Sequence, residues 1–336
     1  KFIFRLATKL AKSGYSVTVL CNREEGKVFL SNVKVIRLPK IGKWRKVQNI
    51  SFAILAIFAI LFMNINFDVV FTRANIYLLP LLILLKKRGK KLIFRTSMYG
   101  TDDGVSLNRS KIGRILLKQL QNWDAIICQT DLFFKSFKEI GIDETKLKII
   151  PVAVDTNIYK PIDPCQQLRL KNKIDIQSSP LVLCVGGIIR RKGIDLLAVA
   201  WKKVLKKWPD AKLLLVGPIH YDNEKNRNYY REVYEIFESY SGLESINFTG
   251  GVVDPSPYFR ACDLFVFPSR QEGSPNVLVE AMACQKPIVT TRFVGFTPYI
   301  GENNEDFIVV EPDDPAKLAD SICMLLENKN LQCAIA

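Results

Sequence analysis

The sequence has only one histidine, His220, among its 336 residues. This scarcity excludes a metal centre built from several histidine ligands. The eight cysteines are scattered along the chain, and no two of them form a Cys-x-x-Cys pair. Such spacing is typical of buried, reduced thiols in a cytosolic protein and does not indicate a disulfide framework.

A glycine pattern is missing as well. The Gly-x-Gly-x-x-Gly fingerprint does not occur at a strand–helix junction, and its absence disfavours a nicotinamide-dependent dehydrogenase. Apolar residues, in contrast, are abundant and make up 48% of the chain. Because 336 residues exceed what one core usually holds, two domains are expected.

Acidic residues are few in the first half of the chain. Residues 1–150 contain 27 Lys and Arg against 10 Asp and Glu, a net charge of +17, whereas residues 151–336 contain 21 against 23, a net charge of −2. This asymmetry indicates an anionic partner for the first half, such as a membrane surface or an acidic acceptor. Nucleic acid is a competing partner, but no recognised binding motif accompanies the charge. A basic, solvated surface without a partner is the third interpretation.

One long uncharged run extends from Val47 to Phe67, directly after the basic segment Lys43–Lys46. Its length is near the roughly 20 residues that a membrane span needs. Three asparagines shorten the apolar part to Ile50–Met63, and a strand is expected immediately afterwards. These features favour a buried or membrane-facing helix over a true span. Basic residues beside an apolar helix suit attachment to one leaflet, so we expect a cytoplasmic protein, peripheral at the inner face of the cell membrane.

Strands and helices alternate along the first half. The expected strands are Val17–Cys21, Val33–Leu38, Asp68–Thr72, Lys91–Thr96, Ala125–Gln129 and Lys148–Val152. The expected helical or apolar segments are Lys1–Ser13, Ile50–Met63, Ile76–Leu85, Lys111–Leu120 and Leu132–Ile140. Because the chain opens on a helix, we expect that a first strand is missing. Such alternation predicts a parallel sheet covered on both faces.

The second half repeats this plan after a connector, Pro151–Pro164. The expected strands are Leu181–Val185, Lys212–Val216, Ile246–Thr249, Leu264–Phe267, Pro287–Thr291 and Phe307–Val310. The expected helices are Ile194–Lys207, Asn228–Tyr240, Pro257–Ala261, Asn276–Ala283 and Ala316–Glu327. Two doubly wound α/β domains are therefore predicted, with residues 1–158 in the first and 159–336 in the second. In such sheets ligands bind beyond the carboxyl ends of the strands.

The most informative stretch is Gln271–Glu280, which follows a strand ended by proline. Ser274 is expected to cap a helix that begins at Pro275. Backbone N–H groups at such a helix start attract phosphate or sugar oxygens. Glu272 precedes the helix, and Glu280 lies about one and a half turns inside it, with its side chain leaning back towards the start. Two carboxylates beside one polar pocket suit an activated sugar.

Two further strand ends carry glycine. Gly186 and Gly187 precede the helix Ile194–Lys207 and permit close approach of a ligand to the backbone, and Lys192 offers a charge to phosphate. Gly217 follows another strand. Taken alone, glycine after a strand is usually just a turn.

The stretch Phe267–Thr291, with Glu272 and Glu280 separated by seven residues, resembles the signature of GT4-type retaining glycosyltransferases, the glycosyl transferases of group 1. Lys192-Gly193 resembles the phosphate-binding loop of that family, and Ile150–Asp155 resembles its interdomain connector. The resemblance implies a GT-B fold, in which two Rossmann-like domains face one another across a cleft. It implies acceptor binding by residues 1–158 and nucleotide-sugar binding by residues 159–336.

The resemblance also implies roles for single residues. Glu272 is expected at the donor sugar, Glu280 at the ribose and Lys192 at the leaving diphosphate. Donor contacts are expected from Gly186, Gly187, Lys192, Gly217, Gly273, Ser274, Asn276, Val277 and Glu280. The family retains the anomeric configuration by same-face attack without a protein nucleophile, and neither a cofactor nor a metal is expected.

The chain departs from the family pattern at two positions. Gly187 stands where many members carry a diphosphate-binding arginine, and Arg190 or Arg191 is expected to substitute, with Arg190 preferred. Tyr99 stands where many members have a His-Gly pair near the reacting sugar.

Two aspartates follow Tyr99. Asp102 or Asp103 is expected to bind or deprotonate an acceptor hydroxyl. A metal-binding aspartate pair and a plain acidic loop are the alternative interpretations of this segment.

The expected reaction is transfer of a sugar from a nucleotide-sugar donor, with UDP as a candidate nucleotide, to a glycan or lipid-linked acceptor in cell-surface polysaccharide synthesis. A catalytically weak nucleotide-sugar-binding protein is one alternative, motivated by Gly187 and Tyr99. A nucleotide-sugar epimerase of related fold is the other. No nucleic-acid partner is expected.

Overall fold

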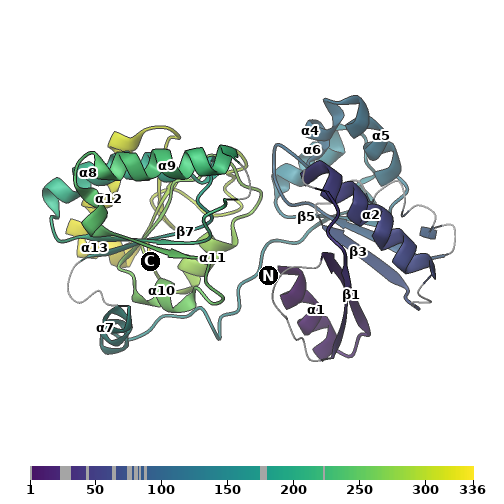
Figure 1. Ribbon diagram of the computed structural model, residues 1–336, viewed down its shortest axis with the longest axis horizontal. Helices are drawn as coiled ribbons and strands as arrows, with labels where there is room; N and C mark the ends of the chain where they lie inside the picture. The colour runs from purple at the N-terminus through teal and green to yellow at the C-terminus, as the bar shows by residue number, and fades with distance from the viewer. Residues whose placement is uncertain are drawn as a thin grey trace. The chain divides into compact units, whose positions relative to one another are not determined.

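The computed structural model describes residues 2–22, 32–42, 45–62, 66–73, 78, 82, 85–86, 89–174, 180–221 and 224–336. The chain divides into two compact units (Figure 1). Unit 1 comprises Lys1–Thr96, Gly104–Ile127 and Phe137–Lys148, and unit 2 comprises Ser97–Asp103, Cys128–Ser136 and Ile149–Ala336.

Unit 1 is built on parallel strands. β1 (Val17–Asn22) pairs with β2 (Val33–Leu38), and β3 (Val69–Arg73), β4 (Lys91–Arg95), β5 (Ala125–Cys128) and β6 (Leu147–Ile149) form a four-stranded sheet in sequence order. The helices along this part of the chain are α1 (Phe2–Lys12), α2 (Arg45–Phe62), α4 (Gly104–Asn108), α5 (Lys111–Leu120), α6 (Asp131–Glu139) and the short η2 (Glu144–Lys146). β5 and α6 each extend into both units.

Helix α5 shows how the sequence dictates this arrangement. Ser110 caps the helix by accepting a hydrogen bond from the backbone N–H of Gly113. Leu116, Leu117 and Leu120 recur on one face of the helix and are buried. The core of unit 1 that they help to form includes Trp123, whose ring meets that of Phe94 edge-on at 6.2 Å.

Unit 2 contains a six-stranded parallel sheet with the order β12-β11-β10-β7-β8-β9. Its strands are β7 (Leu181–Val185), β8 (Lys212–Val216), β9 (Ile246–Gly250), β10 (Leu264–Phe267), β11 (Ile288–Thr291) and β12 (Ile308–Val310). The central strands are apolar on both sides, as a sheet covered on both faces requires.

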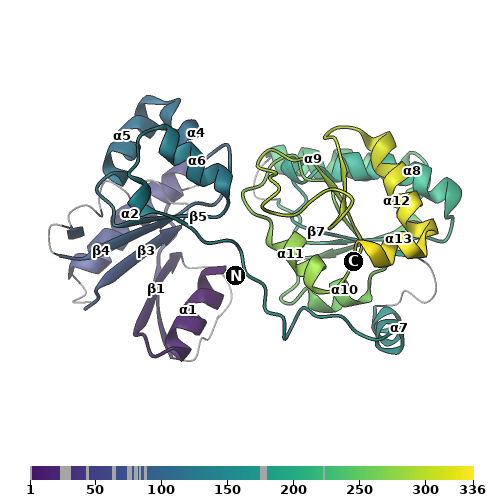
Figure 2. The same cartoon turned by 180° about the vertical axis from the view of Figure 1, so that it is seen from behind.

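Helices cover both faces of this sheet (Figure 2). One core cluster joins α8 (Ile194–Lys207), α9 (Glu224–Glu238) and α12 (Pro315–Glu327) to one set of alternating strand residues. The other cluster joins α10 (Ser256–Ala261) and α11 (Asn276–Ala283) to the opposite set. The remaining elements are α7 (Pro164–Lys173), η3 (Arg190–Lys192), η4 (Gly242–Ser245) and α13 (Lys329–Ala334).

The predicted fold class is confirmed: the chain is α/β, with parallel sheets and a doubly wound order in unit 2. Helix α7 was not predicted, because its exposed and polar sequence lacks an apolar stripe. Helix α9 begins at Glu224, earlier than the expected Asn228, because its first turn is polar. Lys1, Met63 and most of Ile76–Leu85 lie outside the described residues. Among the helices that the structure describes, none combines the length and the apolar character that a membrane crossing requires.

Gly193 separates η3 from α8 and adopts a left-handed backbone with φ of +64°. A Cβ atom here would lie 1.9 Å from the carbonyl oxygen of Pro268, at the end of β10. The segment after β7 is therefore pressed directly against the segment after β10. Only glycine permits this approach.

We expect Gly193→Ala to lower the free energy of unfolding by about 3 kcal/mol or more, because the new methyl group adds a clash to the cost of a left-handed backbone. Gly141→Ala is the matched control, since Gly141 has φ of +81° and no atom within 4 Å of its Cβ position. That control should cost only about 1–2 kcal/mol. Urea unfolding measures both losses, and equal losses would contradict the close approach at Pro268.

Candidate functional site

The strand order of unit 2 indicates where a ligand binds. β7 and β10 are neighbours, and from them the chain winds outwards in opposite directions. Doubly wound sheets bind ligands beyond the carboxyl ends of the strands at this switch point. The segments that follow the two strands, Gly186–Gly193 and Pro268–Gly273, carry the candidate site.

Glu272 lies at the centre of this site and is only 7% exposed. Its Oε1 atom accepts hydrogen bonds from Lys192 Nζ at 2.6 Å and from Ser269 Oγ at 2.8 Å. Arg191 Nη1 lies 2.5 Å from the same oxygen. Two cations thus share one carboxylate, and these three side chains retain one net positive charge. A buried excess of positive charge favours an anionic ligand.

Lys192 reaches Glu272 along the backbone of the glycine segment. The Cβ position of Gly186 lies 3.3 Å from the Lys192 stem, so the glycine leaves room for that stem. The ammonium lies 5.0 Å from the ring centre of Phe267, and the side chain is 14% exposed. These contacts hold the amino group at the switch point.

The structure separates the two arginines that follow Gly187. Arg191 contacts Glu272 and donates from Nη1 to the carbonyl oxygen of Gln271 at 2.8 Å. Arg190, which the sequence favoured as the diphosphate ligand, instead pairs with Glu232 and lies over the ring of Tyr229 at 4.9 Å. Arg191 is therefore the arginine that accompanies Lys192.

A partly buried ion pair connects the first turn of α8 to the segment that follows β10. Arg270 donates from Nη1 and Nη2 to the two carboxylate oxygens of Asp195, each at 2.8 Å. Arg270 Nη1 also donates to the carbonyl oxygen of Arg190 at 2.8 Å, and the Arg270 N–H donates to the carbonyl oxygen of Arg191 at 2.8 Å. Paired hydrogen bonds between guanidinium and carboxylate fix the geometry as well as the contact. Arg270 therefore holds η3, which carries Lys192, in place.

Asp195 is ionised by its partners. Burial alone would raise the pKa of its carboxyl, but hydrogen bonds from Arg270 and Tyr229 and the charge of Arg270 outweigh burial, and the pKa is lowered. Tyr229 donates its hydroxyl to Asp195 at 2.7 Å. Burial, together with the Asp195 charge, raises the pKa of Tyr229. No local sequence pattern indicated this network, because Asp195, Tyr229 and Arg270 lie far apart along the chain.

Helix α11 differs from the prediction at its start. The helix begins at Asn276, its N-cap residue is Pro275, and no side chain caps it. The predicted cap by Ser274 is therefore wrong, because the extended backbone of Pro275 takes the N-cap position instead. Val277 lies in the first turn, and Glu280 is buried at 6% exposure within the helix. The donor roles of these residues and of Gly273 stay predictions.

Local packing leaves little room for a side chain at position 187. A Cβ atom there would lie 2.8 Å from Nε2 of His220, which follows β8. The N–H of Gly186 donates to Val216 and that of Gly217 to Gly250, so both amides are used within the sheet. The departure from the family pattern at Gly187 thus coincides with an imidazole on the neighbouring loop, a contact that no sequence motif indicated.

The segment Ser97–Asp103 belongs to unit 2 and contacts the site. The carbonyl oxygen of Tyr99 accepts a hydrogen bond from Gln271 Nε2 at 2.6 Å. Asp102 accepts from the Met98 N–H at 2.8 Å, and Asp103 accepts from the Gly100 N–H at 2.7 Å. Both aspartates are buried, at 4% and 1% exposure. They hold the turn, and a role of either one towards an acceptor stays a prediction.

Other candidate sites in the described ranges carry no comparable chemistry. No group of His, Cys, Asp or Glu in that part of the chain is arranged to hold a metal ion. The cysteines are free thiols, and burial raises the pKa of Cys128, Cys184 and Cys262 to about 12.

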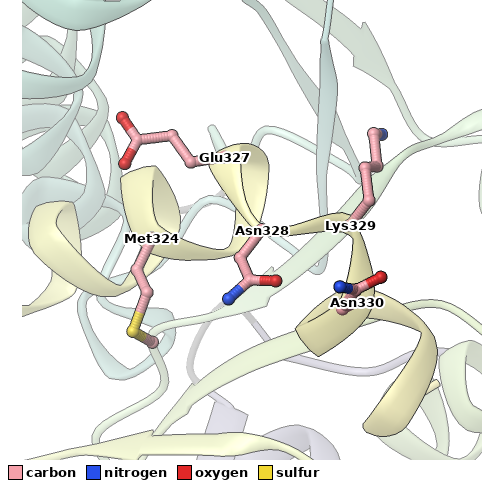
Figure 3. Close-up of a pocket in the computed structure, with 5 residues that line it drawn as sticks. All are labelled: Met324, Glu327, Asn328, Lys329 and Asn330. Atoms are coloured by element: carbon pink, nitrogen blue, oxygen red, sulfur yellow. The ribbon is translucent and has the colours of Figure 1, made fainter.

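A surface hollow lies at the junction of α12 and α13 (Figure 3). Its polar groups already have structural partners. Glu327 pairs with Lys207, Asn328 caps α13, and Lys329 donates to Gln332. The side chains of Met324, Glu327 and Lys329 point in different directions and do not converge on a ligand. We therefore place the functional site at Glu272.

We expect Asp195→Asn to lower the free energy of unfolding by about 2–4 kcal/mol at pH 7, because Arg270 would lose its paired carboxylate. The lowered pKa of Asp195 contributes stability that is present above its unfolded pKa of about 3.9 and is lost as the pH falls through the lower folded pKa. Unfolding measured from pH 6 to pH 2.5 should therefore be less pH-dependent in the variant than in the wild type.

Asp313→Asn is the control for this variant. Asp313 pairs with Nε of the same arginine at 2.9 Å, but its side chain is 64% exposed. Asp313→Asn should lower the free energy of unfolding by less than about 1 kcal/mol. Equal losses from the two variants would contradict the special position of Asp195.

Two family profiles match the chain. The profile described as glycosyltransferase family 4 matches residues 1–158, and the profile described as glycosyl transferases group 1 matches residues 179–328. Together they extend over both halves of the sequence and include the Glu272 site.

Relatives that match this chain are named as glycosyltransferases. A GDP-mannose-dependent alpha-(1-6)-phosphatidylinositol monomannoside mannosyltransferase of Mycobacterium tuberculosis is 24% identical over 249 residues, which cover 71% of this chain and 62% of that protein. The capsular polysaccharide biosynthesis glycosyltransferase CapM of Staphylococcus aureus is 29% identical over 148 residues, which cover 44% of this chain and 37% of that protein. The chain thus matches less than two thirds of the length of either relative.

Solved structures share the fold. HepE of Anabaena, determined in complex with UDP and glucose, matches with a TM-score of 0.77 at 17% identity over 99% of this chain and 87% of that chain. Sucrose-phosphate synthase of Thermosynechococcus elongatus matches with a TM-score of 0.79 at 18% identity over 99% and 85%. From these matches and the two family profiles, we conclude that the chain belongs to the GT4-type glycosyltransferase family and has its GT-B fold.

Proposed function

We propose that this chain transfers a sugar from a nucleoside diphosphate sugar to a glycan or lipid-linked acceptor, with retention of the anomeric configuration. The observation that carries this proposal is the pair of cations, Lys192 and Arg191, held on one buried oxygen of Glu272 at the switch point. The negative charge of a diphosphate balances the positive charge that Glu272 alone leaves unmatched on these two cations.

Donor binding rearranges this cluster. Diphosphate oxygens attract Lys192 and Arg191, because phosphate offers more acceptor oxygens and more charge than one carboxylate. Glu272 is then available to accept hydrogen bonds from hydroxyl groups of the donor sugar. Ser269, whose backbone follows β10, remains as its fixed donor.

The same cations assist bond cleavage. When the bond between the anomeric carbon and the phosphate oxygen breaks, its electron pair leaves with the diphosphate. Lys192 and Arg191 stabilise that developing negative charge, and Glu272 lies where positive charge develops on the sugar. The acceptor oxygen forms the new bond on the same face, and its proton passes to the leaving phosphate. Glu272 is therefore not a nucleophile in this proposal.

The names of relatives suggest a donor, an acceptor and a place of action, and these are part of the proposal. One relative is named for GDP-mannose and phosphatidylinositol monomannoside, and another is named for capsular polysaccharide biosynthesis. One structure of similar fold was determined with UDP and glucose. We infer a nucleoside diphosphate sugar as donor, acceptor binding by residues 1–158, and a role in cell-surface polysaccharide synthesis. The basic first half supports a peripheral position at the cytoplasmic face of the membrane.

We expect Glu272→Gln and Lys192→Met each to lower turnover roughly 100- to 1,000-fold, because each removes a charge that stabilises the transition state. Release of nucleoside diphosphate, with membrane extract as acceptor, measures turnover after a screen of nucleotide-sugars by thermal shift. A true donor at a hundredfold excess over its Kd adds about 2.7 kcal/mol to the stability of the wild type.

Glu311→Gln is the control for these variants, because Glu311 forms an exposed ion pair with Arg292 in the same unit. It should keep full turnover. Full turnover of Glu272→Gln would overturn the residue assignment. Donor binding without transfer to any acceptor would favour the catalytically weak binding protein.

A further inference from the structure

Helix α2 has an unusual distribution of apolar side chains. The residues buried against its own unit are the small alanines Ala53, Ala56 and Ala59, at 1–3% exposure. Five large apolar residues face outwards, namely Val47, Ile50, Ile54, Phe58 and Phe62, at 43–70% exposure, whereas the other large apolar residues of the helix are partly buried. We call these five residues the outer stripe. Their spacing of three and four places them on one side of the helix.

The outer side of α2 is therefore unusually apolar for a surface helix. A helix of a soluble domain normally turns its large apolar residues to the core and its polar residues to water. In the outer stripe, the rings of Phe58 and Phe62 stack at 4.3 Å and form a continuous aromatic surface. Contiguous exposed apolar patches of this kind mark protein or membrane interaction sites.

The sequence around the stripe is basic. Residues 26–67 contain seven Lys and Arg and no Asp or Glu. Of these, Lys34, Arg37 and Lys40 are exposed in the structure. Ile41 is 50% exposed and is joined to α2 by a hydrogen bond from Ser51 Oγ to its carbonyl oxygen at 3.0 Å. Helix α2 itself crosses the near side of unit 1 in Figure 1.

We propose that the outer stripe of α2 docks on an anionic lipid bilayer, with the helix lying in the plane of the membrane surface. Apolar side chains enter the boundary between headgroups and acyl chains, while neighbouring Lys and Arg attract anionic headgroups. This surface rests on the peripheral membrane position in the proposed function and names the residues that provide it, and it does not depend on the transfer reaction.

The small area of the stripe favours a lipid bilayer over a protein partner. From Val47 to Phe62 the stripe is about 22 Å long and roughly 10 Å wide, the width of one helix. That area of about 200 Å² falls well short of the roughly 800 Å² per partner in a stable protein interface. A bilayer needs no matching pocket and adapts to a single helix face.

The test measures co-sedimentation of the full chain with vesicles of phosphatidylcholine alone and of phosphatidylcholine with 30% phosphatidylserine. We expect binding to the anionic vesicles, little binding to the neutral ones, and release by salt. The double variant Ile54→Ser/Phe58→Ser should bind at least about tenfold more weakly, because two apolar side chains no longer enter the bilayer. Lys34→Gln/Lys40→Gln should lose about fivefold for each charge.

Val253→Ser is the matched control, since Val253 is 92% exposed in unit 2 and outside the stripe. It should bind vesicles like the wild type. Circular dichroism and thermal unfolding establish that each variant folds. Absent vesicle binding, or equal binding by the stripe variant and the control, would overturn the proposal. A self-associated chain that the stripe variant dissociates, without vesicle binding, would overturn it in favour of an interface between copies.

Discussion

The candidate site depends on one partly buried ion pair, Asp195 with Arg270. This pair joins two chain segments that follow neighbouring strands of the unit 2 sheet and lie about 75 residues apart in sequence. Through the carbonyl oxygens of Arg190 and Arg191, Arg270 also fixes the segment that carries Lys192. Together with the close backbone approach of Gly193 to Pro268, this connection brings Lys192 to Glu272. The ion pair thus positions the segment, and the charged groups proposed to contact a ligand, Lys192, Arg191 and Glu272, lie beside it.

Charge balance explains why the site suits a diphosphate. Lys192, Arg191 and Glu272 leave one positive charge unmatched, and an unmatched charge that is partly removed from water is costly. A ligand that brings phosphate removes this cost and releases Glu272 for the sugar. Donor binding and preparation of the carboxylate are therefore the same event in this account. The outer stripe of α2 is a separate feature of unit 1, and its chemistry concerns lipid rather than the nucleotide.

Much of the fold could be predicted from the sequence, because buried parallel strands such as Leu181–Val185 and Leu264–Phe267 are short apolar runs with clear ends. Glu272, Lys192 and Glu280 could be identified because they stand in a local motif. The sequence favoured Arg190 over Arg191, but it could not show that one η3 turn points the two side chains to different neighbours. The Asp195–Arg270 pair and the contact of His220 with Gly187 were out of reach for another reason. They join segments that only the folded sheet brings together, and no local pattern records them.

The central claim is that Lys192 and Arg191 are the diphosphate ligands. Isothermal titration of the full chain with UDP, GDP and the corresponding nucleosides tests it most directly, in the wild type and in Lys192→Met. The account predicts that the variant weakens the affinity for the matching nucleoside diphosphate at least about tenfold, the effect of losing one charged hydrogen bond. The affinity for the nucleoside should change little. Equal affinity of both proteins for the nucleoside diphosphate would contradict the account.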